Sequence, residues 1–151
     1  MKMQGSKYKT DVPLFITNPI FQMVSVLLII ANCTKNRNNT ASIGRIMLYM
    51  WGLSSKSNLQ KLIILRRDKN IDDIPITYDS QVLAVVRQCI IDNLITIAND
   101  GLYNLSIGGK SLLFKLRNTN LYMEINSDLN SVGKFPETYV KHLVTNWYAD
   151  I

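Results

Sequence analysis

The chain has 151 residues, of which 47% are hydrophobic and 19% charged, and a formal net charge of +6. These values predict one globular domain, residues 1–151, with a sizeable core, and they exclude a disordered chain. With one histidine and two cysteines, the sequence lacks the residues for a His/Cys metal cluster or a His-based triad. Because no signal-peptide pattern is present, we expect a cytoplasmic protein whose cysteines are reduced.

The net charge is divided unevenly between the two halves of the sequence. Residues 1–70 carry eleven Lys and Arg against two Asp and Glu, a net charge of +9. Residues 71–151 carry six against nine, a net charge of −3. The asymmetry predicts a basic face in the first half that meets an acidic partner or a phosphate backbone.

The start of the sequence predicts a flexible arm followed by a buried helix. Residues 1–11 are polar and basic, and we expect them to be flexible. Asn18 can cap a helix and Pro19 suits its first position. The apolar run of residues 20–31 is shorter than the roughly twenty residues that a membrane span needs. We therefore expect a central helix, covered by the rest of the chain or by another subunit.

Two further helices are predicted before residue 70. The helix at residues 42–52 is apolar on two flanks, which indicates a central position or an interface. One flank consists of Ile43, Ile46, Met47 and Met50, and the other of Leu48, Tyr49 and Trp51. Asn58 is expected to cap the following helix, which ends near Arg66 and Arg67. Because the helices at 19–32 and 42–52 are so apolar, we expect the isolated chain to dissolve poorly until a partner is coexpressed.

Residues 79–116 predict a helix, a β-hairpin and a second helix. Strands at 94–98 and 102–105 flank an Asn-Asp-Gly turn, which supplies the positive φ that a tight hairpin needs. A helix followed by a small hairpin is the second half of a winged helix-turn-helix. We therefore predict a mainly α fold with one small hairpin, in which a winged-helix core at 42–116 carries an additional N-terminal helix and a C-terminal helical extension at 117–151.

The turn after the hairpin comes close to a phosphate-binding motif. Residues 104–111 read N-L-S-I-G-G-K-S, whereas a P-loop requires G-x-x-x-x-G-K-[ST] and would need glycine in place of Asn104. The alternative is that Leu105-Ser106-x-x-Gly109 resembles the step that follows the wing in many winged-helix proteins. Ser106 then caps a helix and Gly109 allows close packing. We favour this alternative, and we predict no enzyme activity, cofactor or metal site.

A second resemblance concerns the first two helices. It is carried by the Asn18-Pro19-Ile20 start, the R-I-M-L-Y-M-W run at residues 45–51, the length and the element order. In these features the chain resembles the middle components of bacterial three-component ATPase systems. Lamassu-type anti-phage defence belongs to this group. The resemblance implies a non-enzymatic subunit that joins two protein partners, an SMC-like ATPase and an effector, often a nuclease.

Two functions compete on these grounds. One is a bridging subunit of a DNA-sensing complex, and the other is a free-standing winged-helix transcriptional regulator. A DNA-reading helix and wing should carry cations for phosphates and base edges. The only cation in residues 79–105 is Arg87, and three aspartates give the segment a net charge of −2. The sequence therefore favours protein docking by this unit and DNA contact, within the complex, by the basic first half.

The candidate residues follow from this choice. Sequence-independent phosphate contacts are predicted for Lys35, Arg37, Lys56, Lys61, Arg66 and Arg67, with an ordinary solvated basic helix as the alternative. Partner docking is predicted for Met47, Met50, Trp51, Arg87, Gln88 and, on the terminal helix, Trp147. Neither set includes a catalytic residue.

Overall fold

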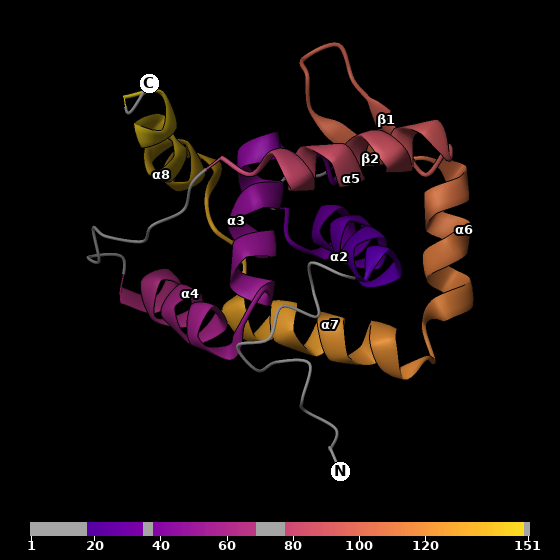
Figure 1. Ribbon diagram of the computed structural model, residues 1–151, viewed down its shortest axis with the longest axis horizontal. Helices are drawn as coiled ribbons and strands as arrows, with labels where there is room; N and C mark the ends of the chain where they lie inside the picture. Colours follow the sequence, from indigo (N-terminus) through magenta and orange to yellow (C-terminus); the bar gives the residue numbers. More distant parts are fainter. Residues whose placement is uncertain (1–17, 35–37, 69–77, 150–151) are drawn as a thin grey trace.

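The computed structural model describes residues 18–34, 38–68 and 78–149, with side chains as far as residue 143. These residues form seven helices and one two-stranded antiparallel sheet (Figure 1). The helices are α2 (Pro19–Asn32), α3 (Ile43–Leu53), α4 (Lys56–Asp68), α5 (Ser80–Ile91), α6 (Ile107–Leu116), α7 (Asn120–Val132) and α8 (Glu137–Ala149). The strands are β1 (Ile95–Ile97) and β2 (Tyr103–Leu105). The prediction of a mainly α fold with a small hairpin is confirmed.

Helix α2 is the centre of the fold. The side chain of Asn18 accepts a hydrogen bond from the Phe21 amide, and Pro19 occupies the first turn, as predicted. Nine of its residues are buried, and α3, α5, α6, α7 and β2 all contact it, so that it lies inside a ring of other elements (Figure 1). No helix formed by the described residues is long and apolar enough to cross a membrane.

Helix α3 is buried by the same chain. Its cap is Ser42, whose hydroxyl accepts a hydrogen bond from the Arg45 amide. Met47 and Met50 are 2% and 1% exposed, so the prediction that they dock a partner is wrong. Periodicity indicated that α3 is covered on two sides, and the cover comes from α2, α4, α5, α7 and α8 of the same chain. Of the exposed apolar surface expected on α2 and α3, the described structure shows one large side chain, Ile20, which is 60% exposed.

Helix α4 begins at Lys56, two residues before the predicted cap. The hydroxyl of Ser55 accepts the Asn58 amide hydrogen bond, while the Asn58 side chain donates to the carbonyl of Trp51. Asn58 therefore ties α4 back to the end of α3. The two helices lie so close that a Cβ on Gly52 would collide with the side chain of Leu62.

The hairpin forms where the sequence predicted it. Ile95 pairs with Leu105 and Ile97 with Tyr103, and Gly101 in the turn has a φ of +82°. An additional pairing was not predicted: Ala41, just before α3, exchanges two backbone hydrogen bonds of 2.8 Å with Tyr103. This bridge fastens β2 to the body of the protein.

The turn from β2 into α6 confirms the packing alternative to a P-loop. The Ser106 hydroxyl accepts the Gly109 amide hydrogen bond and donates to the carbonyl of Asn93. A Cβ at Gly109 would collide with the carbonyl oxygen of Leu94. The glycines therefore let α6 approach the backbone between α5 and β1, and their presence needs no bound phosphate.

Candidate docking and phosphate-contact surfaces

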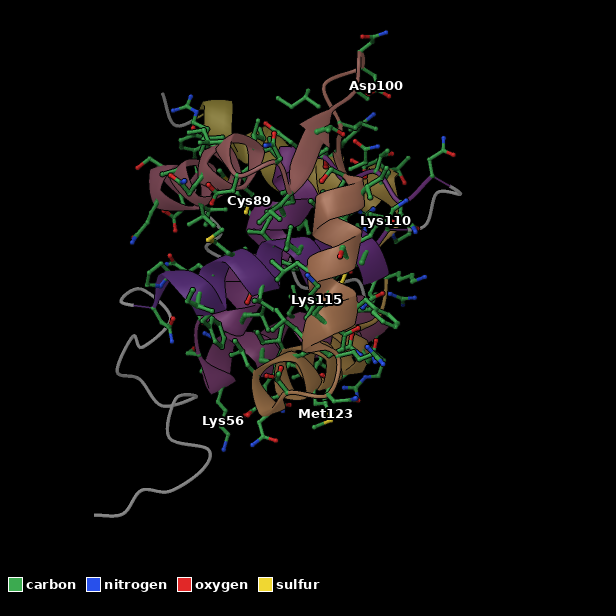
Figure 2. The ribbon with its side chains drawn as sticks, turned by 90° about the vertical axis from the view of Figure 1, so that its right-hand side faces the viewer. Lys56, Cys89, Asp100, Lys110, Lys115 and Met123 are labelled. Carbon is green, nitrogen blue, oxygen red and sulfur yellow. The ribbon has the colours of Figure 1, made fainter. Side chains whose placement is uncertain are left out.

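The structure describes four of the six residues that are predicted to contact phosphate. Lys35 and Arg37 lie outside the described residues. Lys56 and Lys61 are exposed on α4 (Lys56 is labelled in Figure 2). Arg67 is also exposed, and its Nε lies 3.2 Å from Oδ1 of Asp68. The exposed cations of α4 are thus the part of the prediction that the described surface can still accommodate.

Arg66 has a structural contact instead of a fully exposed side chain. Its Nε donates a hydrogen bond of 2.7 Å to the carbonyl of Lys134, and a Cβ on Gly133 would meet its Nε and Cγ at ordinary contact distance. Gly133 has a φ of +86°, which glycine adopts without strain. Arg66 therefore holds the linker between α7 and α8 against α4.

A second arginine, Arg45, is buried in the same region. Its Nη1 donates to the carbonyl of Cys33 at 2.7 Å, and its Nη2 lies 3.1 Å from Oε1 of Glu137 on α8. The side chain is 2% exposed, so this cation cannot meet DNA phosphates. No role was predicted for Arg45, although a lone arginine within an apolar helix is a signal for a buried cation with partners in its own chain.

Tyr49 completes the attachment of the linker. Its hydroxyl donates to the carbonyl of Gly133 at 2.6 Å and accepts from the Phe135 amide at 3.2 Å. The Tyr49 and Phe135 rings meet edge to face, with their centroids 5.9 Å apart. Burial raises the pKa of the Tyr49 hydroxyl well above its ordinary value, so the group stays a neutral donor. We call Arg45, Tyr49 and Arg66 the linker clamp.

The outward face of α5 is exposed, as the docking prediction requires. Val82, Val86 and Cys89 face the core, and the opposite side carries exposed Arg87 and Gln88. The Gln88 amide donates to the Asp92 carboxylate at 3.2 Å. At the end of α5 and on β1, the side chains of Ile91 and Ile97 are 70% and 54% exposed. The α5–hairpin surface, defined by Arg87, Gln88, Ile91 and Ile97, therefore combines one cation with two apolar side chains.

The two predicted tryptophans contribute less to a surface. Trp51 is half-buried and packs against the core cluster from α3. Trp147 lies on α8, but its side chain is outside the described part of the structure. The prediction that Trp147 docks a partner stays a prediction.

Helix α6 carries a further exposed surface, which was not among the predicted sites. Its outer side holds exposed Ile107 and Phe114, seven residues apart, together with the cations Lys110, Lys115 and Arg117. The Arg117 guanidinium lies 3.7 Å from the centroid of the Phe114 ring. Figure 2 labels Lys110 and Lys115 on α6, which faces the viewer. We call these five residues the α6 edge, and their seven-residue apolar spacing was its signal in the sequence.

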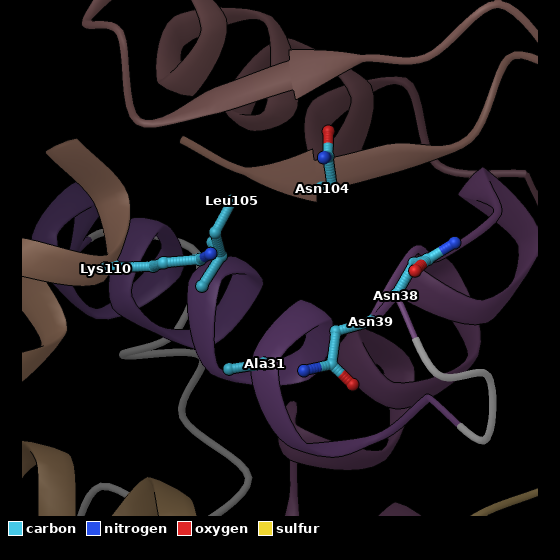
Figure 3. A pocket seen from close by; sticks show the side chains of 6 residues that line it. All are labelled: Ala31, Asn38, Asn39, Asn104, Leu105 and Lys110. Carbon is cyan, nitrogen blue, oxygen red and sulfur yellow. The ribbon is translucent and has the colours of Figure 1, made fainter. Parts of the chain in front are cut away.

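A pocket of about 290 Å³ borders the α6 edge. It is lined by Ala31, Asn38, Asn39, Asn104, Leu105 and Lys110 (Figure 3). The Oδ1 atoms of Asn39 and Asn104 accept hydrogen bonds from the hydroxyls of Thr34 and Thr96. Their amide NH₂ groups and the Lys110 ammonium are donors that remain for other partners. The pocket therefore suits an anionic or carbonyl oxygen.

The two cysteines and the metal-ligand residue types offer no reactive group or metal site among the described residues. Cys33 and Cys89 are both free and buried, and burial raises the pKa of each thiol to about 12, so neither is a reactive thiolate at neutral pH. Among the described residues, no three His, Cys, Asp or Glu side chains come together as a metal site.

Comparison with known proteins gives no match. No family model fits the chain, and no curated protein or solved structure is significantly similar to it.

Proposed function

We propose that this protein is a non-enzymatic winged-helix subunit of a cytoplasmic, DNA-sensing anti-phage complex. In this proposal it joins an SMC-like ATPase to an effector such as a nuclease. The choice of partners rests on the resemblance of the Asn18–Ile20 start and the 45–51 run to Lamassu-like middle components. The docking role rests on the surface properties of the described residues.

The observation that carries the docking role is the make-up of the α5–hairpin surface. Arg87 is its one cation, and exposed Ile91 and Ile97 are the kind of apolar side chains that anchor protein interfaces. Asp92 and Asp100 lie on the same unit and repel a phosphate backbone. A protein partner gains from this combination, whereas DNA does not.

The winged-helix part of the proposal is supported by the attachment of the hairpin. β2 pairs with β1 on one side and with Ala41 on the other. The hairpin is therefore paired on both sides of β2, and this attachment to the rest of the domain supports the interpretation of the hairpin as a wing. Between Ala41 and the hairpin the described residues form three helices, α3, α4 and α5, which is one more than the two helices of a helix-turn-helix.

The experiment is coexpression of the tagged chain with the products of its neighbouring genes. We expect the chain to elute with both an ATPase and an effector in gel filtration. Combining Arg87→Glu with Ile97→Glu should release one partner, because it places two carboxylates on the docking surface. Lys61→Glu on α4 is the matched control and should leave the assembly intact. Failure of the wild-type chain to join either partner would contradict the proposal.

The alternative function, a free-standing regulator, predicts the opposite dependence on Arg87. It requires sequence-specific duplex binding by the chain alone, lost in Arg87→Ala. The bridging proposal instead expects DNA binding by the assembled complex to depend on Lys56, Lys61 and Arg67. Each lost phosphate contact should reduce the log–log salt slope by about one. Titrations of a mixed-sequence duplex across salt distinguish the two functions.

A further inference from the structure

We infer that the α6 edge is a docking surface for an acidic protein segment that carries spaced apolar side chains. The inference goes beyond the proposed function, which assigns no partner to α6. It rests on three properties of the edge: apolar anchors, charge, and the adjoining pocket.

The anchors are two large apolar side chains on one face of α6. Ile107 is 87% and Phe114 64% exposed, and a spacing of seven residues places them two turns apart on the same side. Leu113 and Gly109 on the opposite side are buried against the chain. The Arg117 guanidinium covers one face of the Phe114 ring and leaves the rest of the ring available. Such residues are the ones that dominate binding energy in protein interfaces.

The charge of the edge defines the chemistry of its partner. Lys110, Lys115 and Arg117 are exposed, and residues 107–117 include no acidic residue. The acidic residues that flank this segment along the chain lie on other elements, Asp100 in the hairpin turn and Glu124 on α7. A segment rich in Asp and Glu therefore complements α6 and is steered to it.

The pocket adds a specific place for one carboxylate of that segment. Figure 3 shows Lys110 reaching from α6 toward Leu105, and Asn104 on the strand above it. The Lys110 ammonium is a donor that can bind one oxygen of a carboxylate, whereas the side chains of Asn39 and Asn104 point away from each other (Figure 3). The segment would then place an acid in the pocket and apolar side chains over Ile107 and Phe114.

Other classes of ligand fit the edge less well. A nucleic-acid backbone gains nothing from an isoleucine that is 87% exposed. A membrane would receive only Ile107 and Phe114, because Leu112, Leu113 and Leu116 face the chain's own core cluster. A protein segment uses both the apolar and the cationic groups.

The test is a selection from a random 16-residue peptide library displayed on phage, against the full chain. We expect the enriched peptides to be acidic and to carry apolar residues at regular spacing. For a synthetic copy of one such peptide, fluorescence anisotropy should show that Phe114→Ser raises Kd by about tenfold or more, as loss of an interface anchor does. Lys110→Gln should weaken binding and its salt dependence.

The control variants are Lys61→Gln on α4 and Ile97→Ser on the hairpin, which should bind the peptide as the wild type does. Ile97→Ser also separates this inference from the α5–hairpin proposal. The inference is overturned if no peptide is enriched, if the enriched peptides are not acidic, or if Phe114→Ser binds them equally. It is also overturned if mixed-sequence duplex DNA or phosphatidylserine vesicles bind the chain and lose binding in Phe114→Ser.

Discussion

The linker clamp and the α6 edge use the same kinds of residue in opposite ways. In the clamp, Arg45 and Arg66 donate to carbonyl groups and a carboxylate of their own chain. On the edge, Lys110 and Lys115 are exposed beside Phe114, which is exposed as well. The comparison teaches that net charge alone does not locate a binding surface: a cation that completes the fold is no longer available to a partner.

The largest effect is expected from breaking the clamp at Arg45. Arg45→Ala leaves the buried Cys33 carbonyl without its donor and removes the tie to Glu137. We expect the free energy of unfolding to fall by about 3 kcal/mol, the upper range for an unsatisfied buried group together with lost packing. Urea unfolding followed by circular dichroism measures this loss.

The matched variant for this experiment is Arg45→Lys. Lysine keeps the charge but cannot reach the Cys33 carbonyl and Glu137 with the same forked geometry. We expect an intermediate loss of stability. If Arg45→Ala unfolds at the same urea concentration as the wild type, the clamp does not stabilise the linker.

A smaller effect is expected where the α6 edge meets the body of the protein. Gly109→Ala forces a methyl group against the carbonyl of Leu94, so that α6 must move away from the hairpin. Overpacking of this kind costs about 1–3 kcal/mol. Thermal unfolding measures the loss, and Ser111→Ala on the exposed side of α6 is the control, expected within about 0.5 kcal/mol of the wild type. If Gly109→Ala is as stable as the wild type, the backbone at Leu94 can move away from the added methyl group at little cost, which contradicts the prediction.

The smallest effect concerns α7. Burial, and secondarily the charge of Asp128, raises the pKa of Glu124 above its ordinary value. The folded protein therefore binds this proton more tightly than the unfolded chain, and the stability it contributes is present at low pH and lost as the pH rises through the folded pKa. Glu124→Gln should stabilise the protein by roughly 0.2–0.5 kcal/mol at pH 7, the size of a like-charge i,i+4 repulsion.

The same variant should show no gain at about pH 3, where the unfolded and folded carboxyl groups are both protonated. Urea midpoints at the two pH values make the comparison. A gain of equal size at both would mean that the Glu124 charge is not its cause.

Much of the fold was predictable because its signals are local. The Asn18-Pro19 start of α2, the Asp-Gly turn and the Ser106 cap each depend on the chemistry of a few neighbouring residues. The Ala41 bridge to Tyr103 joins residues far apart in the sequence, and no local pattern marks it.

The candidate site was less predictable for the same reason. Arg45 and Arg66 were two cations among several, and their partners Glu137 and Lys134 lie 92 and 68 residues further along the chain. The helical spacing of Met47 and Met50 predicts that their side of the helix is buried. The spacing does not show whether the same chain or a second chain buries it. The exposed side of α5, with Arg87 and Gln88, and the exposed cations of α4 could be predicted from their own helices.

The two buried thiols allow the frequency of local opening to be measured at two places in the protein. Cys33 lies beside the clamp, and Cys89 lies on the inner side of α5. A thiol reagent reaches either sulfur only when its surroundings open, so the alkylation rate of each thiol reports the frequency of that local opening. The native sequence therefore contains two separate reporters of local opening, one beside the linker clamp and one on the inner side of α5.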